Sequence, residues 1–136
     1  ECSAMLYRFL IELKNYISAG DSNQKTARQK QLQTVINFIE RNYYRSFSLE
    51  EMAEVIKVTP QHLCRLFKQA FNMRPFVYLT MLRLQKAKEI IISSENIHIK
   101  NIAQQVGYND PSYFCSLFKE YEGFTPLEFK KMHRSV

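Results

Sequence analysis

The chain has 136 residues, of which 46% are hydrophobic and 24% charged; this is the balance of a small globular protein and excludes a disordered or fibrous chain. We expect neither a membrane span nor a signal peptide, because no apolar run approaches the roughly 18 residues of a span and charged residues interrupt the first one. Nineteen Lys and Arg against thirteen Asp and Glu give a net charge of +6, which favours an anionic partner such as nucleic acid or a lipid surface.

The first predicted element is an amphipathic helix over residues 1–19. Its apolar side chains form one helical stripe that contains Met5, Leu6, Phe9, Leu10, Leu13 and Ile17. Gly20 suits the left-handed position after a helix, and residues 20–30 are polar without periodicity, so we expect a linker there. We interpret residues 1–19 as the end of a preceding domain or of its dimer interface, and residues 31–136 as a domain of their own.

A second helix follows and fades near Tyr43. Its apolar stripe contains Leu32, Val35, Ile36 and Ile39. Ser48 and Glu51 then have the spacing of a capping box, in which each side chain accepts a hydrogen bond from the free backbone N–H of the other residue. We therefore expect a further helix to begin directly after Ser48.

A tandem repeat occupies the rest of the chain. The segment 59–68 (Thr-Pro-Gln-His-Leu-Cys-Arg-Leu-Phe-Lys) reappears at 110–119 as Asp-Pro-Ser-Tyr-Phe-Cys-Ser-Leu-Phe-Lys. In both copies a Thr or Asp can cap a helix, and proline follows at the first helical position, where its missing N–H has no cost. Upstream, residues 49–56 match residues 99–106 at an offset that is one residue shorter, so the second copy has an extra residue in a turn. The pattern indicates a duplicated helix-turn-helix, which in a basic chain indicates DNA.

Further signals define the later elements. Asn72 and Gly123 close the two repeated helices, because both tolerate left-handed backbone geometry. Between the copies a long helix is predicted over residues 75–92, with a length of about 27 Å. Thr125 and Glu128 have the capping pattern for a last helix, whereas the first copy has an arginine in place of that threonine and a weaker cap. The predicted fold is all-α: two helix-turn-helix units joined by a long central helix, preceded by an N-terminal helix and linker.

The two repeated helices have the same two faces. Core-facing stripes contain Leu63, Leu66, Phe67 and Ala70 in the first helix and Phe114, Leu117, Phe118 and Tyr121 in the second. The opposite stripes contain Gln61, Cys64, Arg65 and Lys68 in the first helix and Ser112, Cys115, Ser116 and Lys119 in the second. A recognition helix presents the N-terminal part of such a stripe to base edges in the major groove.

The candidate DNA-binding side chains of the two stripes are unequal. Arg65 can donate two hydrogen bonds to guanine O6 and N7, and Gln61 can pair with adenine by the same logic. Lys68 and Lys119 suit phosphates, while the serines of the second stripe reach bases only on close approach. We therefore expect the first copy to supply most direct base readout and the second to add phosphate contact. The alternative for Arg65 is a solvated surface charge or an ion pair.

Other side chains on these helices have simpler interpretations. The cysteines of the two stripes could be redox-sensitive DNA contacts, but we favour a small side chain tolerated near a groove, because no activating cluster accompanies them. The aromatic side chains could stack on the bases of a single strand, but most recur at core positions of the repeat.

We expect no enzyme activity, no metal and no cofactor. The histidines His62, His98 and His133 lack the spacing of metal ligands, and the three cysteines contain no Cys-x-x-Cys pair. Reduced thiols in a cytoplasmic protein account for the cysteine pattern. The acidic side chains of Glu50, Glu51, Glu120 and Glu122 are interpreted as helix-surface charges rather than as acid–base pairs.

Residues 48–131 resemble the C-terminal DNA-binding domain of AraC/XylS-type transcription regulators. The resemblance is carried by residues 102–114 (Ile-Ala-Gln-Gln-Val-Gly-Tyr-Asn-Asp-Pro-Ser-Tyr-Phe), 118–119, 123–129, 63–68 and 83–87. It implies seven helices in two helix-turn-helix units, with both recognition helices in successive major grooves of double-stranded DNA. It also implies base contacts from the positions of Gln61, Cys64, Arg65, Ser112, Tyr113, Cys115 and Ser116.

The resemblance further implies a bacterial transcription activator with RNA polymerase as a further partner. In such regulators a preceding domain binds an effector, often a sugar or another small molecule, or forms a homodimer. Two residues depart from the family pattern. Lys57 stands where the family often has glycine, and Ser116 stands where an arginine is common, in agreement with weaker base readout by the second unit.

Three other functions stay open on the sequence alone. A helical protein-interaction module could use the basic surface to bind an acidic partner. An enzyme is disfavoured because no catalytic motif is present. Binding of RNA or of single-stranded DNA would use the same charge and the aromatic side chains.

Overall fold

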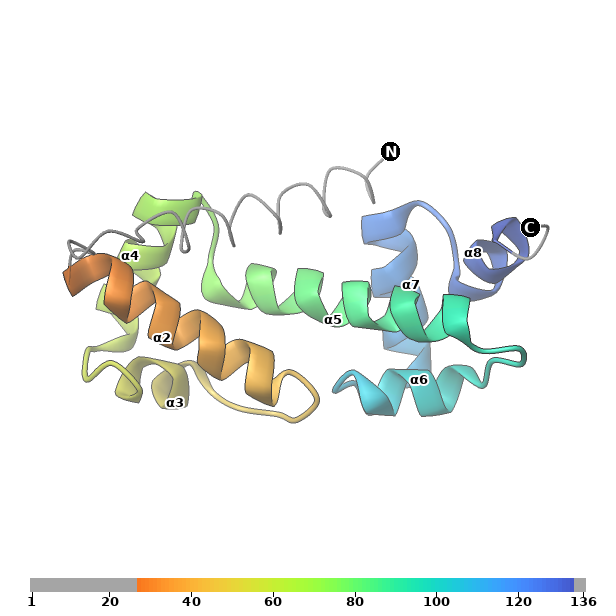
Figure 1. Ribbon diagram of the computed structural model, residues 1–136, viewed down its shortest axis with the longest axis horizontal. Helices are drawn as coiled ribbons and strands as arrows, with labels where there is room; N and C mark the ends of the chain where they lie inside the picture. Colours follow the sequence, from red (N-terminus) through yellow and green to blue (C-terminus); the bar gives the residue numbers. More distant parts are fainter. Residues whose placement is uncertain (1–26, 134–136) are drawn as a thin grey trace.

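The computed structural model describes residues 27–133, and within them the chain forms seven helices and no strand (Figure 1). The helices are α2 (Ala27–Asn42), α3 (Leu49–Glu54), α4 (Pro60–Phe71), α5 (Pro75–Ser93), α6 (Ile99–Gln105), α7 (Pro111–Glu122) and α8 (Pro126–Met132). The predicted all-α fold with two helix-turn-helix pairs, α3–α4 and α6–α7, is confirmed. In this part of the chain no helix is both long and apolar enough to cross a membrane.

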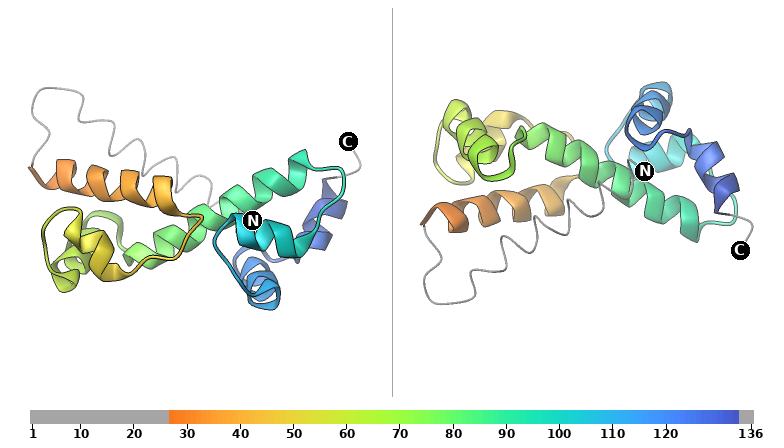
Figure 2. Two further views of the ribbon diagram at one scale, coloured as in Figure 1. Left: turned by 90° about the horizontal axis from the view of Figure 1, so that it is seen from below. Right: turned by 90° about the horizontal axis from the view of Figure 1, so that it is seen from above.

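The long helix α5 divides the other helices into two units (Figure 2). Helices α2, α3 and α4 pack with its first half, and α6, α7 and α8 pack with its second half. Each unit has its own hydrophobic core. The first core includes Leu32, Ile39, Met52, Leu63, Phe67 and Leu82, and the second includes Leu84, Ile91, Ile102, Phe114 and Phe118. Along α5, the change from one core to the other therefore falls between Leu82 and Leu84.

Helix α2 begins earlier than the sequence indicates. The sequence predicts a linker up to residue 30, but residues 27–30 form the first turn of α2. Alanine, arginine, glutamine and lysine are good helix formers, and an exposed polar turn has no apolar periodicity that would reveal it. The predicted helix over residues 1–19 and most of the linker lie outside the described residues, so the division into domains stays a prediction.

The helix N-termini have the predicted caps. The hydroxyl oxygens of Ser48, Thr59 and Thr125 accept from the backbone N–H three residues on, and the Asp110 carboxylate accepts from two N–H groups of α7. At the C-termini of α4 and α7, Asn72 and Gly123 are left-handed. The arginine that replaces Thr125 in the first copy makes no side-chain cap. Local sequence therefore fixes where both repeated helices begin and end.

Only one of the two predicted capping boxes is complete. Glu128 accepts from the Thr125 N–H at 2.9 Å, and the hydrogen bonds from the Thr125 backbone and side chain hold the pKa of Glu128 below its usual value. At the start of α3 the Ser48 hydroxyl accepts from the Glu51 N–H, as expected, but the Glu51 carboxylate lies 3.3 Å from the Arg45 guanidinium instead.

The interpretation of Glu122 as a surface charge is wrong. Its side chain is 1% exposed, and Lys88 Nζ on α5 lies 3.1 Å from its Oε1, within ion-pair distance although outside hydrogen-bond geometry. Glu122 follows Phe118 by one helical repeat and so lies on the core face of α7. A buried pair of this kind adds little net stability, but removing one partner leaves an unpaired buried charge.

Most of the predicted core aromatic side chains are buried. They are Phe67, Phe71, Tyr78, Phe114, Phe118 and Phe129. Edge-to-face contacts join Phe67 to Phe71 at 4.9 Å and Phe118 to Phe129 at 5.7 Å, as aromatic pairs prefer. Phe76 and Phe124 are the exceptions, since they are 40% and 38% exposed.

The turns inside the two helix-turn-helix units hold equivalent residues in left-handed backbone geometry. Lys57 has a φ of 59° and Gly107 a φ of 99°. A Cβ atom at Gly107 would lie 2.6 Å from the Tyr43 carbonyl oxygen, which excludes any side chain there. Lys57 is exposed, so the first turn has room for a side chain but holds it in an unfavourable conformation.

Substitutions at Lys57 and Gly107 should change the free energy of unfolding in opposite directions. Lys57→Gly should raise the free energy of unfolding by about 0.5–1 kcal/mol, because relief of left-handed strain exceeds the added entropy of the unfolded chain. Gly107→Ala should lower it by about 3 kcal/mol or more, because the methyl group meets the Tyr43 carbonyl. Urea unfolding of the two variants checks this, and a loss of stability in Lys57→Gly would contradict the strain argument.

Candidate nucleic-acid interface

Helix α4 separates an apolar face from a polar one. Its buried side chains are Leu63, Leu66, Phe67 and Phe71. On the opposite face Gln61, Arg65 and Lys68 are exposed, and Cys64 is half-buried at the edge. Because Thr59 caps the helix and Pro60 begins it, this polar stripe starts within the first turn, as it does in a recognition helix.

Helix α7 repeats this arrangement with different side chains. Phe114 and Phe118 are fully buried. Ser112, Ser116 and Lys119 are exposed on the opposite face, and Cys115 is half-buried in the position equivalent to Cys64. The two stripes predicted from the sequence are therefore both on the surface. Their side chains differ in reach, as the sequence indicates.

The long polar side chains of the first stripe have no partner within residues 27–133. No hydrogen bond or ion pair in this range engages Gln61, Arg65 or Lys68 through its side chain. An ion pair for Arg65, one of the two alternatives to DNA contact, thus has no support in the described part of the chain. Lys119 on the second stripe is close enough to Glu128 for its charge to help lower the pKa of that carboxyl, after the hydrogen bonds from Thr125.

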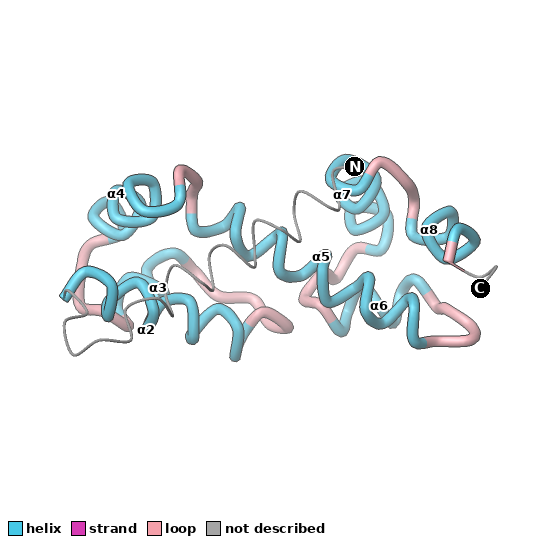
Figure 3. The backbone as a smooth tube through the Cα atoms, turned by 45° about the horizontal axis from the view of Figure 1, so that its top comes forward, coloured by secondary structure: helices cyan, strands magenta, loops and turns pink. Residues whose placement is uncertain are grey.

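The two stripes belong to helices that are similarly placed on the central helix. Figures 2 and 3 show α4 and α7 on the same side of α5, one toward each end. Helix α5 has 19 residues and so extends about 28 Å. The fold thus presents two exposed polar helix faces that are held apart by a rigid spacer.

Tyr113, which only the family resemblance indicates, is the most exposed aromatic side chain of α7, with 55% exposure. Its ring contacts that of Tyr108 at 5.8 Å between centroids. Tyr108 is buried, and the Arg83 guanidinium lies 5.0 Å from its ring centroid. The equivalent residues of the first unit are His62 and Val58, so this edge-to-face contact of two tyrosines has no counterpart there. Simple helical periodicity cannot reveal it, because Arg83 lies on α5 and Tyr108 lies in the turn between α6 and α7.

The thiol of Cys115 is not set up for redox chemistry. Partial burial raises the pKa of Cys115, which favours the protonated thiol over the reactive thiolate. This supports the interpretation of the two cysteines as small side chains beside the stripe. No group of three His, Cys, Asp or Glu side chains within residues 27–133 could hold a metal ion.

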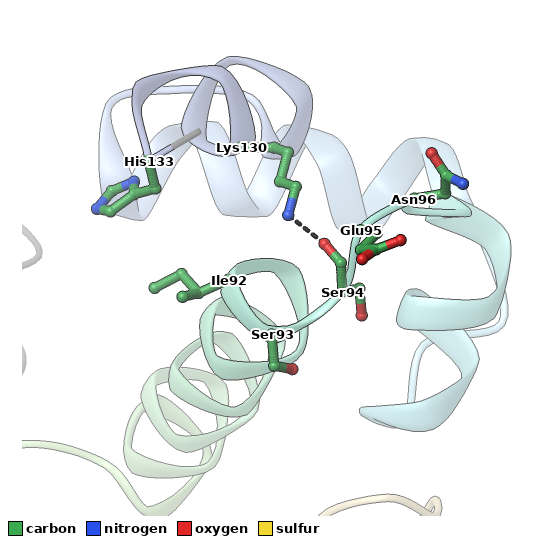
Figure 4. A pocket seen from close by; sticks show the side chains of 7 residues that line it. All are labelled: Ile92, Ser93, Ser94, Glu95, Asn96, Lys130 and His133. Carbon is green, nitrogen blue, oxygen red and sulfur yellow. Dashed lines mark hydrogen bonds between the residues drawn. The ribbon is translucent and has the colours of Figure 1, made fainter. Parts of the chain in front are cut away.

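A polar pocket of about 470 Å³ lies apart from the stripes, between the end of α5 and α8 (Figure 4). Its lining comprises Ile92, Ser93, Ser94, Glu95, Asn96, Lys130 and His133. The Lys130 ammonium donates to the carbonyl oxygens of Ile91 and Ser94 and so caps the C-terminus of α5. The lysine of the pocket is therefore engaged in fixing α8 against α5.

Comparison with known proteins places the two units in a common type of domain. A family model described as a helix-turn-helix domain matches residues 52–132. The raffinose operon transcriptional regulatory protein RafR of Pediococcus pentosaceus is 29% identical over 94% of this chain and 46% of its own length. The lactose operon transcription activator of Staphylococcus xylosus is 29% identical over 92% of this chain and 44% of its own length. The chain thus spans less than half the length of these relatives.

The fold is also found in solved structures. A transcriptional regulator from Chromobacterium violaceum, described as containing an AraC-type DNA-binding domain, superposes with a TM-score of 0.72 at 25% sequence identity. The superposition covers 79% of this chain and 95% of that one. It therefore includes both helix-turn-helix units rather than a single motif.

Proposed function

The chain belongs to the AraC family of helix-turn-helix transcription regulators, and from that premise we propose that it binds duplex DNA sequence-specifically with α4 and α7 in successive major grooves, as part of a bacterial activator. The observation that carries the proposal is the exposed polar stripe on each of α4 and α7, two helices that lie on the same side of α5. Groove centres one turn apart are separated by about 34 Å, which α5 and its flanking turns can match.

The two helices would divide the work of recognition. Gln61 and Arg65 on α4 have the length and donors to read base edges, and Lys68 suits a phosphate. Cys64 lies between them at the edge of the same face. The first unit would therefore account for most of the direct readout.

The second unit would read bases at shorter range. Ser112, Tyr113, Cys115 and Ser116 are the candidates for base contact on α7, and Lys119 is the candidate for a phosphate contact. Of these, Tyr113 has the greatest reach, and its apolar ring suits a thymine methyl group. The serines would contribute hydrogen bonds only where the backbone approaches the groove closely.

The remaining functions belong to the whole protein. Because the relatives are more than twice as long as the matched part, we assign binding of an effector to a domain that precedes this one. The names of the two relatives refer to raffinose and lactose operons, which makes a sugar the first effector to examine. We further propose that the same preceding domain forms the homodimer and that RNA polymerase is the partner in activation. We assign no enzymatic role to the described helices, and we expect the protein to act in the cytoplasm.

Selection from random duplex DNA tests the proposed function. The chain should enrich one family of duplexes with two conserved blocks, centred about 10 base pairs apart. Its affinity should fall with salt at a logarithmic slope of about −0.9 for each phosphate neutralised. Enrichment of no duplex, with retention of an acidic protein or a single-stranded probe instead, would contradict the proposal.

Truncation of one side chain on each helix tests whether α4 makes more of the direct base readout than α7. Arg65→Ala should cost about 1–3 kcal/mol on the selected duplex and relax the preference at one base pair, because a bidentate base contact is lost. Ser116→Ala, the matched change on α7, should cost less. Electrophoretic mobility shifts with single-base variants of the duplex measure both effects. A uniform loss on all sequences for Arg65→Ala, or a larger loss for Ser116→Ala, would overturn the ranking.

A further inference from the structure

Three segments from both units meet at the middle of α5: the turn after α2, α5 itself, and the turn between α6 and α7 (Figure 1). Arg83 donates from Nε to the Tyr43 carbonyl oxygen at 2.8 Å and from Nη2 to the Arg45 carbonyl oxygen at 2.9 Å. A Cβ atom at Gly107 would lie 2.9 Å from Arg83 Cζ, so the second unit's turn touches the same guanidinium. Arg83 thus donates to the first unit from Nε and Nη2, while its Nε and Cζ lie against the turn of the second unit.

The contacts of Arg83 continue into the recognition helix of the second unit. Its Cζ lies 5.0 Å from the ring centroid of Tyr108, within cation–π range. Tyr108 is 8% exposed and packs on Phe114 at 5.9 Å and on Tyr113 at 5.8 Å, both in the first turn of α7. A continuous chain of contacts therefore runs from the turn after α2 through Arg83 to the exposed end of α7.

Arg83 lies on α5 at the boundary between the two cores. The residue before it, Leu82, belongs to the first core, and the residue after it, Leu84, belongs to the second. The turn residue that binds Arg83, Tyr43, packs against both cores without being fully buried in either. The planar guanidinium holds its N–H donors in a fixed fork, so it bonds two carbonyl groups in one plane and faces an aromatic ring in a set orientation, whereas the ammonium of a lysine imposes no such geometry.

We infer that Arg83 is a positioning residue that holds α7 at a fixed angle to α4 and thereby sets the groove spacing that the domain reads. The DNA step of this inference rests on the proposed function, whereas the angle between the helices is a property of the protein alone. Removal of the Arg83 side chain leaves the two cores in place but allows the angle between α4 and α7 to vary.

A distance measurement without DNA tests the protein step. In the full chain, with Cys2, Cys64 and Cys115 changed to serine, spin labels are attached at Gln61→Cys and Ser112→Cys, which are equivalent exposed positions on α4 and α7. Pulsed electron resonance should give a narrow distance distribution. Arg83→Leu should broaden it, while Lys100→Leu, which removes one positive charge from an exposed position on α6, should leave it narrow. An unchanged distribution in Arg83→Leu would overturn the inference.

The DNA step is tested with duplexes of altered spacing. Inserting two base pairs between the conserved blocks of the selected duplex turns one block by about 70° relative to the other. The unaltered chain should lose affinity steeply, because the advantage of two linked contacts depends on geometry. In Arg83→Leu this penalty should shrink by about tenfold, with binding to a single block unchanged. The same penalty as in the unaltered chain, or an equal loss on the single block, would refute the inference.

The two tests separate the inference from the proposed function. If the unaltered chain shows no spacing penalty, the proposed function fails, and the spin-label distances still decide the structural role of Arg83. If Arg83→Leu does not fold, Arg83→Lys replaces it in both tests, because it keeps the charge but not the fork. Arg83→Lys should also broaden the distances and reduce the penalty, and wild-type behaviour of a folded Arg83→Lys would contradict the inference.

Discussion

The placement of both helix-turn-helix units depends on α5, a single uninterrupted helix that contributes to two hydrophobic cores. Its only proline stands at the first position, so the backbone hydrogen bonds run unbroken across the change from the first core to the second. A flexible linker would let the two recognition helices sample many separations, and the gain from binding two grooves at once would fall accordingly. The rigid spacer holds the two helix-turn-helix units at a defined separation, and Arg83 adds contacts with both units at the middle of this spacer.

The two repeated units have the same helical scaffold but different side chains on the exposed stripes of α4 and α7. Thr59 and Asp110 cap equivalent helices, Pro60 and Pro111 begin them, and Asn72 and Gly123 end them. The exposed stripes share only a cysteine and a lysine. The interiors differ as well, because within residues 27–133 only the second unit has a buried ion pair, Lys88–Glu122, and an edge-to-face contact of Tyr113 with Tyr108. The two units therefore share a scaffold but differ in surface chemistry, with long polar side chains on α4 and short ones on α7.

The sequence predicts this fold well because its signals are local. Caps, prolines at the first helical position and apolar stripes depend on residues within one or two turns. They locate the starts of α3, α4, α5, α7 and α8 and the ends of α4, α5 and α7 to within a residue or two. The stripes on α4 and α7 are predicted for the same reason. Contacts between helices have no such signal: neither the Lys88–Glu122 pair nor the bonds from Arg83 to the turn after α2 can be read from spacing. The start of α2 was missed because an exposed polar turn resembles a linker.

The role of α5 as a spacer depends on the entry of α4 and α7 into successive major grooves on one face of the duplex. Hydroxyl-radical footprinting of the full chain on its selected duplex measures this, because it reports protected sugars at single-nucleotide resolution. We expect two protected windows about 10 base pairs apart, both on the same face of the duplex. A single window, or two windows offset by half a helical turn, would contradict it.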